Sequence, residues 1–210
     1  MKKTFVLVVL FIMPIVAYLF FASGINNFGR LPILTENVSD INKIDAAVTL
    51  RDKITILGFL GKEIHLKKGI AFNLNQKIYK PFYEFKDFQF VMVVLEGNEK
   101  EVAVIKKELG NFTDIKNWKF VFAKENEILS FFKDLKTDYK LDSNLSSPYV
   151  CIIDRDMNLR GRDDDEEEGV KYGFDATSVA DLNNKMEDDV KIILAEYRMA
   201  LKKNNAYRKE

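Results

Sequence analysis

The stretch ITILGFLGKEIHLKKG, residues 54–69, shows how the chain is built. Its mostly apolar start, Ile54–Leu60, has the length of a strand, and such a run is typical of a strand buried on both faces of a sheet. A loop with several charged residues follows, and a helical pattern begins shortly after it. We therefore predict a central strand with a loop at its carboxyl end that leads into a helix.

Strand and helix patterns alternate outward from this central strand. The other expected strands are residues 88–97, 118–123 and 149–154, with a hairpin partner at 158–162, and the expected helices are 71–85, 101–109, 125–135 and a last helix that Ser178 opens and that runs to Leu201. Strands that alternate with helices imply right-handed parallel crossovers. The hairpin near the end makes the sheet mixed, so we predict an α/β fold.

The N-terminal residues carry a membrane signal. Lys2 and Lys3 precede the uncharged run Thr4–Ser23, which at about 1.5 Å per residue can cross a hydrocarbon core of roughly 30 Å. We interpret residues 1–25 as one transmembrane helix, either an anchor or an uncleaved signal, residues 26–40 as a tether, and residues 41–210 as a single domain. A cleaved signal peptide is the alternative, although its apolar core typically spans only about 7–15 residues.

The charge pattern also predicts where the domain lies and what it does not bind. Lysines that precede a membrane span stay in the cytoplasm, so we expect the domain on the periplasmic side of the inner membrane. The chain has 32 basic and 32 acidic residues and no formal net charge. Because no basic field would attract a polyanion, we expect no nucleic-acid partner.

The order of elements behind an N-terminal anchor resembles the thioredoxin-like superfamily. Within it, the chain is most similar to the Sco/SenC group of membrane-anchored copper-oxidase assembly proteins and their peroxiredoxin-like relatives. The resemblance spans about residues 32–201, and its most specific part is SSPYVCIIDRDMNLRGR, Ser146–Arg162. It implies a three-layer sandwich with a mixed central sheet, and it makes Pro148 a candidate cis-proline, since only X-Pro bonds adopt the cis form at low cost.

The chain departs from this family where the family carries its function. Sco-type proteins bind copper through a CxxxC after the first core strand and a distal His before the hairpin strand. The corresponding places here read GKEIHL, residues 61–66, and Ser146. Soft thiolates select cuprous copper, and disulfide exchange needs a thiolate attacker. We therefore predict no catalytic residues and no cofactor, while the question of enzymatic activity stays open.

Three other features are candidates for a site. His65 is the only histidine and could bind a metal or shuttle a proton, although a plain exposed position is the simpler interpretation. Cys151 is the only cysteine, and its apolar strand favours inert packing over reactivity. The run RGRDDDEEEG, residues 160–169, favours a solvated loop, and the alternative is a metal or partner site. The metal candidates are His65, Asp163, Asp164, Asp165 and Glu166.

Two functional hypotheses follow from the sequence. The first is a membrane-anchored, non-redox thioredoxin-like module that binds or assembles an envelope protein partner, where the partner rests on analogy alone. The second is an atypical thiol oxidoreductase or metal-binding protein that uses Cys151 or His65.

Overall fold

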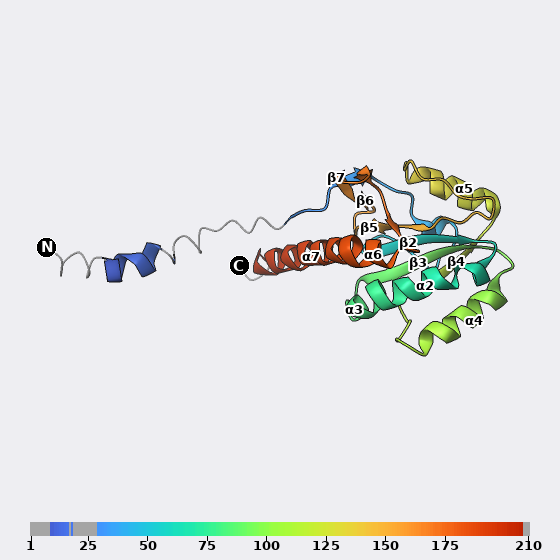
Figure 1. Cartoon of the computed structure of the whole chain (residues 1–210), viewed down its shortest axis with the longest axis horizontal. Helices are drawn as coiled ribbons and strands as arrows, with labels where there is room; N and C mark the ends of the chain where they lie inside the picture. The colour runs from blue at the N-terminus through green and yellow to red at the C-terminus, as the bar shows by residue number, and fades with distance from the viewer. Residues whose placement is uncertain (1–8, 17, 19–28, 208–210) are drawn as a thin grey trace.

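The structure of the protein is a computed structural model, which describes residues 9–16, 18 and 29–207, with side chains up to residue 200 (Figure 1). In this part of the chain, no helix combines the length and the apolar character that crossing a membrane requires. The transmembrane helix expected at residues 1–25 lies mostly outside the described residues, and it stays a prediction.

The central sheet is mixed and has seven strands. They are β1 (Ile33–Thr35), β2 (Ile54–Gly61), β3 (Phe88–Leu95), β4 (Trp118–Ala123), β5 (Tyr149–Ile153), β6 (Leu159–Arg160) and β9 (Phe174–Asp175). The order across the sheet is β1-β6-β5-β2-β3-β4, with β9 paired to β5 off this path. Strands β2, β3 and β4 run parallel, whereas β5 and β6 form an antiparallel hairpin against β2. The predicted mixed sheet is confirmed.

Helices cover both faces of the sheet. The helix after β2 is continuous through α2 (Lys68–Leu74), the π-helical turn η3 (Asn75–Tyr79) and α3 (Lys80–Phe82), and a short 3-10 turn, η2 (Ile64–Lys67), precedes it. The others are η1 (Ile41–Lys43), α4 (Glu99–Gly110), α5 (Glu125–Asp134) and a last helix made of α6 (Val179–Asp181), the π-helical turn η4 (Leu182–Met186) and α7 (Glu187–Tyr207). Ser178 opens this last helix, since its Oγ accepts a hydrogen bond from the Asp181 amide at 3.2 Å.

Two hydrophobic clusters divide the core by the faces of the sheet. Alternate residues of β2 and β3, such as Ile56 and Phe90, pack with α2, α4 and α7. Their neighbours Leu57 and Val91 pack with α5 and with residues 38–50. Because side chains alternate across a strand, each central strand contributes to both clusters. The result is the three-layer arrangement that Figure 1 shows.

The segment before residue 41 also belongs to the sheet. Strand β1 lies within the range expected to be a tether, and it pairs antiparallel with β6. Leu31 and Val38 on either side of it are buried in the two clusters. A strand of three residues leaves no periodic pattern in a sequence, which is why the pattern of residues 26–40 gave no sign of it.

Candidate functional site

The loop that follows β2 occupies the place where the resemblance implies a redox site. Gly61, the last residue of β2, has a φ of +66° where this loop begins, and a Cβ atom on it would lie 1.9 Å from the carbonyl oxygen of Asn144. The Lys62 amide donates a hydrogen bond to that oxygen at 2.8 Å, and the Asn144 side chain donates to Glu63 Oε2 at 2.6 Å. These contacts close the loop against the segment that precedes β5.

Ser146 stands where the resemblance places a distal imidazole, and its polar groups are already engaged. It is fully buried, and its hydroxyl donates to Asp142 Oδ2 at 2.8 Å while its amide donates to Oδ1 at 2.9 Å. Burial is the largest influence on the Asp142 pKa and raises it, but the hydrogen bonds from Ser146 and the charge of Lys67 together hold this pKa below its usual value. The position therefore forms a hydrogen-bonded turn and offers no free ligand.

His65 lies on η2 at the surface. Its side chain is 59% exposed, and its Nδ1 is 3.6 Å from Glu101 Oε2 on α4. In the described part of the chain, no group of three or more His, Cys, Asp or Glu side chains is arranged to hold a metal ion. A single imidazole beside a single carboxylate is a weak ligand set.

Cys151 lies in the middle of β5 and is 4% exposed. Burial raises the pKa of its thiol to about 12, so the reactive thiolate is almost absent at neutral pH. Its side chain packs in the cluster beneath α5, whereas His65 contacts α4 on the other face. The structure does not bring Cys151 and His65 together.

The peptide bond before Pro148 is not cis. The cis-proline expected from the resemblance is therefore wrong for this chain. The neighbouring amide of Ser147 instead donates to the carbonyl of Phe59 at 3.0 Å, which continues the attachment of this segment to β2.

The acidic run lies in a β-hairpin where we expected a loop, and five of its six acidic residues are exposed. Strand β7 (Arg162–Asp165) pairs antiparallel with β8 (Gly169–Lys171). Asp165 is 7% exposed, and its carboxylate pairs with Lys185 at 3.0 Å. Asp163, Asp164 and Glu166 remain exposed.

Further ion pairs join the hairpin to the last helix. Lys171 is 2% exposed, and its ammonium pairs with Glu168 and lies 3.3 Å from Asp181. Arg162 pairs with the buried Asp189 of α7 at 2.8 Å. Sequence reasoning missed the pairs with the last helix because Lys185 lies 20 residues from Asp165 and Asp189 lies 27 residues from Arg162, and only folding brings them to the hairpin.

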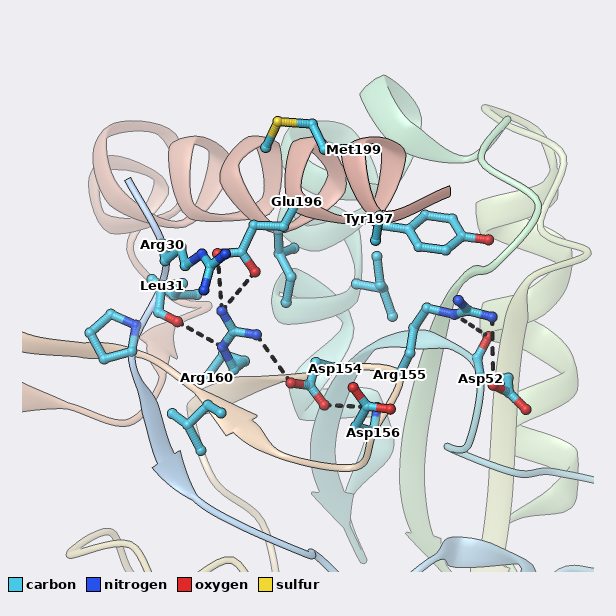
Figure 2. A pocket seen from close by; sticks show the side chains of 15 residues that line it. Arg30, Leu31, Asp52, Asp154, Arg155, Asp156, Arg160, Glu196, Tyr197 and Met199 are labelled. Atoms are coloured by element: carbon cyan, nitrogen blue, oxygen red, sulfur yellow. Dashed lines mark hydrogen bonds and ion pairs between the residues drawn. The ribbon is translucent and has the colours of Figure 1, made fainter. Parts of the chain in front are cut away.

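An open cleft of about 770 Å³ lies at the other end of β2, and sequence reasoning did not find it (Figure 2). Its walls come from four separated segments: residues 30–33, the start of β2 at Ile54, the turn 154–156 between β5 and β6, and residues 193–200 of α7. Because these segments are distant in sequence, no local motif marks the cleft.

Arg160 forms the charged floor of this cleft. It is 8% exposed, and its guanidinium donates to the Leu31 carbonyl at 2.7 Å, to Asp154 Oδ2 at 3.1 Å and to Glu196 Oε2 at 2.8 Å. Two carboxylates thus share one buried cation, which leaves the trio with a formal net charge of −1, and the network joins the N-terminal segment, the hairpin turn and α7.

A second arginine shapes one wall of the cleft. The Arg155 guanidinium lies over the Tyr197 ring, 4.4 Å from its centroid, and its Nε donates to the Asp52 carbonyl at 3.1 Å. The Tyr197 hydroxyl donates to Asp87 Oδ2 at 2.6 Å, which fixes the ring. Arg30 and Asp156 lie at the mouth, and no ion pair joins either side chain to another residue that the structure describes.

The connection of the strands decides the class of this fold. Strands β2 and β3 are parallel and joined through a helix, β5 and β6 form an antiparallel hairpin on the other side of β2, and a last helix packs on the sheet. The fold is thioredoxin-like. Along the chain, the parallel strand β4, with α4 and α5, lies between the half made of β2, its helix and β3 and the half made of β5, β6 and the last helix.

Comparisons with known proteins give structural similarity only. No protein-family model matches the chain, and no curated protein matches it. BsSco, a member of the Sco family of cytochrome c oxidase assembly proteins, is 12% identical over 77% of this chain and 95% of its own, with a TM-score of 0.47. A thiol:disulfide interchange protein of the thioredoxin family from Chlorobium tepidum TLS is 20% identical over 70% and 86%, with a TM-score of 0.43. Copper-bound ScoI of Arabidopsis thaliana is 18% identical over 69% and 89%, with a TM-score of 0.42.

Proposed function

We propose that this protein is a membrane-anchored thioredoxin-like module that binds a partner protein on the exported face of the membrane and carries out no thiol redox chemistry. The burial of Cys151 is the observation that supports this most directly. Disulfide exchange needs a thiolate attacker and a second sulfur that resolves the mixed disulfide. The only thiol of the 210 residues is inside the core, with a pKa raised to about 12.

The loop after β2 supports the same conclusion. Its polar groups are paired with the segment before β5, through Lys62, Glu63 and Asn144. A loop that is held in this way presents a fixed surface and no reactive group. A role in assembling an envelope complex is what the sequence resemblance implies, and the partner is accordingly an envelope protein by analogy.

Thiol labelling of the folded full chain in detergent tests the redox part of this proposal. We expect a small aromatic disulfide reagent to react with Cys151 only after denaturant is added. We also expect no turnover of a dithiol substrate, by the wild type or by Cys151→Ala. Rapid labelling of the native protein, together with dithiol turnover that Cys151→Ala abolishes, would establish the oxidoreductase alternative instead.

Alkaline extraction of membranes tests the anchor. The full chain should stay in the membrane pellet, and protease added on the exported side should digest the domain. A chain that is released into the soluble fraction would refute the anchored module and favour a cleaved signal peptide.

Copper titration tests the metal-binding alternative. Because His65 has only Glu101 beside it, we expect no stoichiometric binding in equilibrium dialysis, for the wild type or for His65→Ala. Tight binding of one copper ion that His65→Ala removes would replace the proposed function.

A further inference from the structure

We infer that the cleft between α7 and residues 30–33 holds the head group of a membrane phospholipid that carries a primary ammonium next to its phosphate. This inference rests on the membrane anchor of the proposed function and adds a ligand to it. The cleft lies at the opposite end of β2 from the loop where a thioredoxin-like fold would carry its redox site, roughly 25 Å away for a strand of this length. It is therefore a separate site.

The position of the cleft relative to the anchor is the first argument. The apolar run ends at Ser23, and seven residues lead from it to Arg30 at the mouth of the cleft. A chain of seven residues reaches at most about 25 Å, so the anchor keeps this mouth near the bilayer surface. The loop after β2 lies at the far end of the domain.

The direction of α7 supports this placement. In Figure 1 the C-terminal end of α7 and the described start of the domain near residue 29 lie on the same side of the molecule. Residues 198–207, at the end of α7, contain three basic residues and no acidic residue. A basic segment on that side is attracted to the phosphates of a membrane surface.

The charges at the mouth of the cleft decide the class of head group. The Arg160 guanidinium on the floor is already paired with the carboxylates of Asp154 and Glu196. Arg30 and Asp156 have no ion-pair partner among the described residues, and Figure 2 shows them on different sides of the cleft. A guanidinium binds phosphate oxygens through charge-assisted hydrogen bonds, and a carboxylate accepts from a primary ammonium. The two open charges therefore fit a zwitterion.

The apolar wall fits the rest of a phospholipid. Ile33 is 49% exposed although it lies on β1, and it lines the cleft together with Pro32 and Met199. These side chains can contact the glycerol and the first methylene groups of a lipid whose head group binds Arg30 and Asp156 at the mouth of the cleft. A soluble zwitterion would leave this apolar wall in water.

Photocrosslinking in vesicles tests the inference on the full chain. A benzophenone amino acid replaces Ile33 at the cleft, and a matched variant carries it at Leu66, which is 64% exposed on η2. The proteins are reconstituted into vesicles of phosphatidylcholine alone or with phosphatidylethanolamine or phosphatidylglycerol. We expect the Ile33 site to capture phosphatidylethanolamine about tenfold more than phosphatidylcholine, as the loss of one charged hydrogen bond predicts, and the Leu66 site to capture almost none.

Variants of Asp156 and Arg30 test the contact with the ammonium and the contact with the phosphate separately. Asp156→Asn should remove the preference for phosphatidylethanolamine over phosphatidylcholine, and Arg30→Gln should lower the capture of both lipids. Asp163→Asn and Lys100→Gln change exposed charges elsewhere and should leave the capture unchanged.

The outcomes distinguish this inference from the proposed function. Equal capture at Ile33 and Leu66, capture of a protein in place of lipid at Ile33, or a preference that Asp156→Asn does not change would overturn the lipid site while the anchor stands. Protection of Ile33 by soluble glycerophosphoethanolamine, without any capture of lipid, would show that the cleft takes a soluble ester and would also overturn it. A chain that alkaline extraction releases from the vesicles refutes the anchor itself.

Discussion

The side-chain amide of Asn144 donates a hydrogen bond to Glu63 Oε2 at 2.6 Å and so joins the loop before β5 to the loop after β2. The Asn144 carbonyl accepts from Lys62 in the same contact. The place that would carry a redox site is thus closed by polar contacts between two segments that lie some eighty residues apart in sequence.

Gly61 makes this closure possible, and Gly61→Ala should destabilise the protein by about 2–4 kcal/mol. The cost combines a left-handed backbone conformation with an overlap of the new Cβ with the Asn144 carbonyl oxygen. Gly69→Ala is the matched control: Gly69 lies in α2 with open space around it, so the change should stabilise the helix by up to about 1 kcal/mol. Urea denaturation followed by circular dichroism measures both, and an equal effect of the two changes would contradict the expectation.

The buried cation on the floor of the cleft should be essential for stability. Arg160→Met leaves the carboxylates of Asp154 and Glu196 without their partner, which should cost about 3–5 kcal/mol. Lys191→Met removes a cation that pairs with Glu187 on the exposed face of α7, and it should have no measurable effect. Both free energies of unfolding come from denaturant titration, and a harmless Arg160→Met would show that the network contributes little.

Asn75 offers a stabilising substitution. It is fully buried in the π-helical turn η3, and neither atom of its amide has a hydrogen-bond partner among the described residues. Asn75→Leu keeps the branching and the number of side-chain heavy atoms and removes two unsatisfied groups, so it should stabilise the fold by about 1–2 kcal/mol. Asn73→Leu, which deletes the hydrogen bond to the Ala176 carbonyl at 3.1 Å, should instead destabilise it. A rise in the melting temperature for the first and a fall for the second checks the pair.

Asp165 should make the protein sensitive to acid. Burial is the largest influence on its pKa and raises it, but the hydrogen bond from Lys185 and those from the amides of Glu167 and Glu168 together hold this pKa below 3.8. Because the folded state binds this proton more weakly than the unfolded state, the carboxylate stabilises the fold above pH 3.8, and this stabilisation is lost as the pH falls through the lowered pKa.

The variant Asp165→Asn tests this assignment. Its unfolding free energy should be lower than that of the wild type at neutral pH, and it should take up one proton fewer on acid unfolding. Asp163→Asn, on the exposed side of the same hairpin, should follow the wild-type pH profile. A wild-type profile in Asp165→Asn would assign the acid sensitivity to other groups.

Much of the fold could be predicted because its long elements have strong local patterns. The strand Trp118–Ala123 has the predicted bounds, and α5 ends one residue before its predicted end. The helix predicted at 71–85 occupies 68–82 and passes through Pro81. The short strands β1, β7, β8 and β9 were missed, since two to four residues are too few to show a period of two, whereas β6 was predicted as the hairpin partner of β5.

The candidate site could be predicted only in part. The absence of a CxxxC is a property of composition, because a chain with one cysteine cannot hold that motif. The burial of Cys151 followed from its apolar neighbours in β5. The hairpin of the acidic run did not follow, because its stability depends on Lys185 and Asp189 of the last helix.

The sequence by itself determined the alternation of strands and helices, the two faces of each central strand and the lack of paired thiols. These are local properties, set by the spacing of apolar side chains and by residue identity. The tertiary structure alone decided the trans bond before Pro148, the pairing of buried charges around Lys171 and Arg160, and the cleft beside α7. The physical reason is that ion pairs and cavities depend on which distant segments lie together in a region of low dielectric constant. Those neighbours are fixed only when the helices and loops pack on the two faces of the sheet.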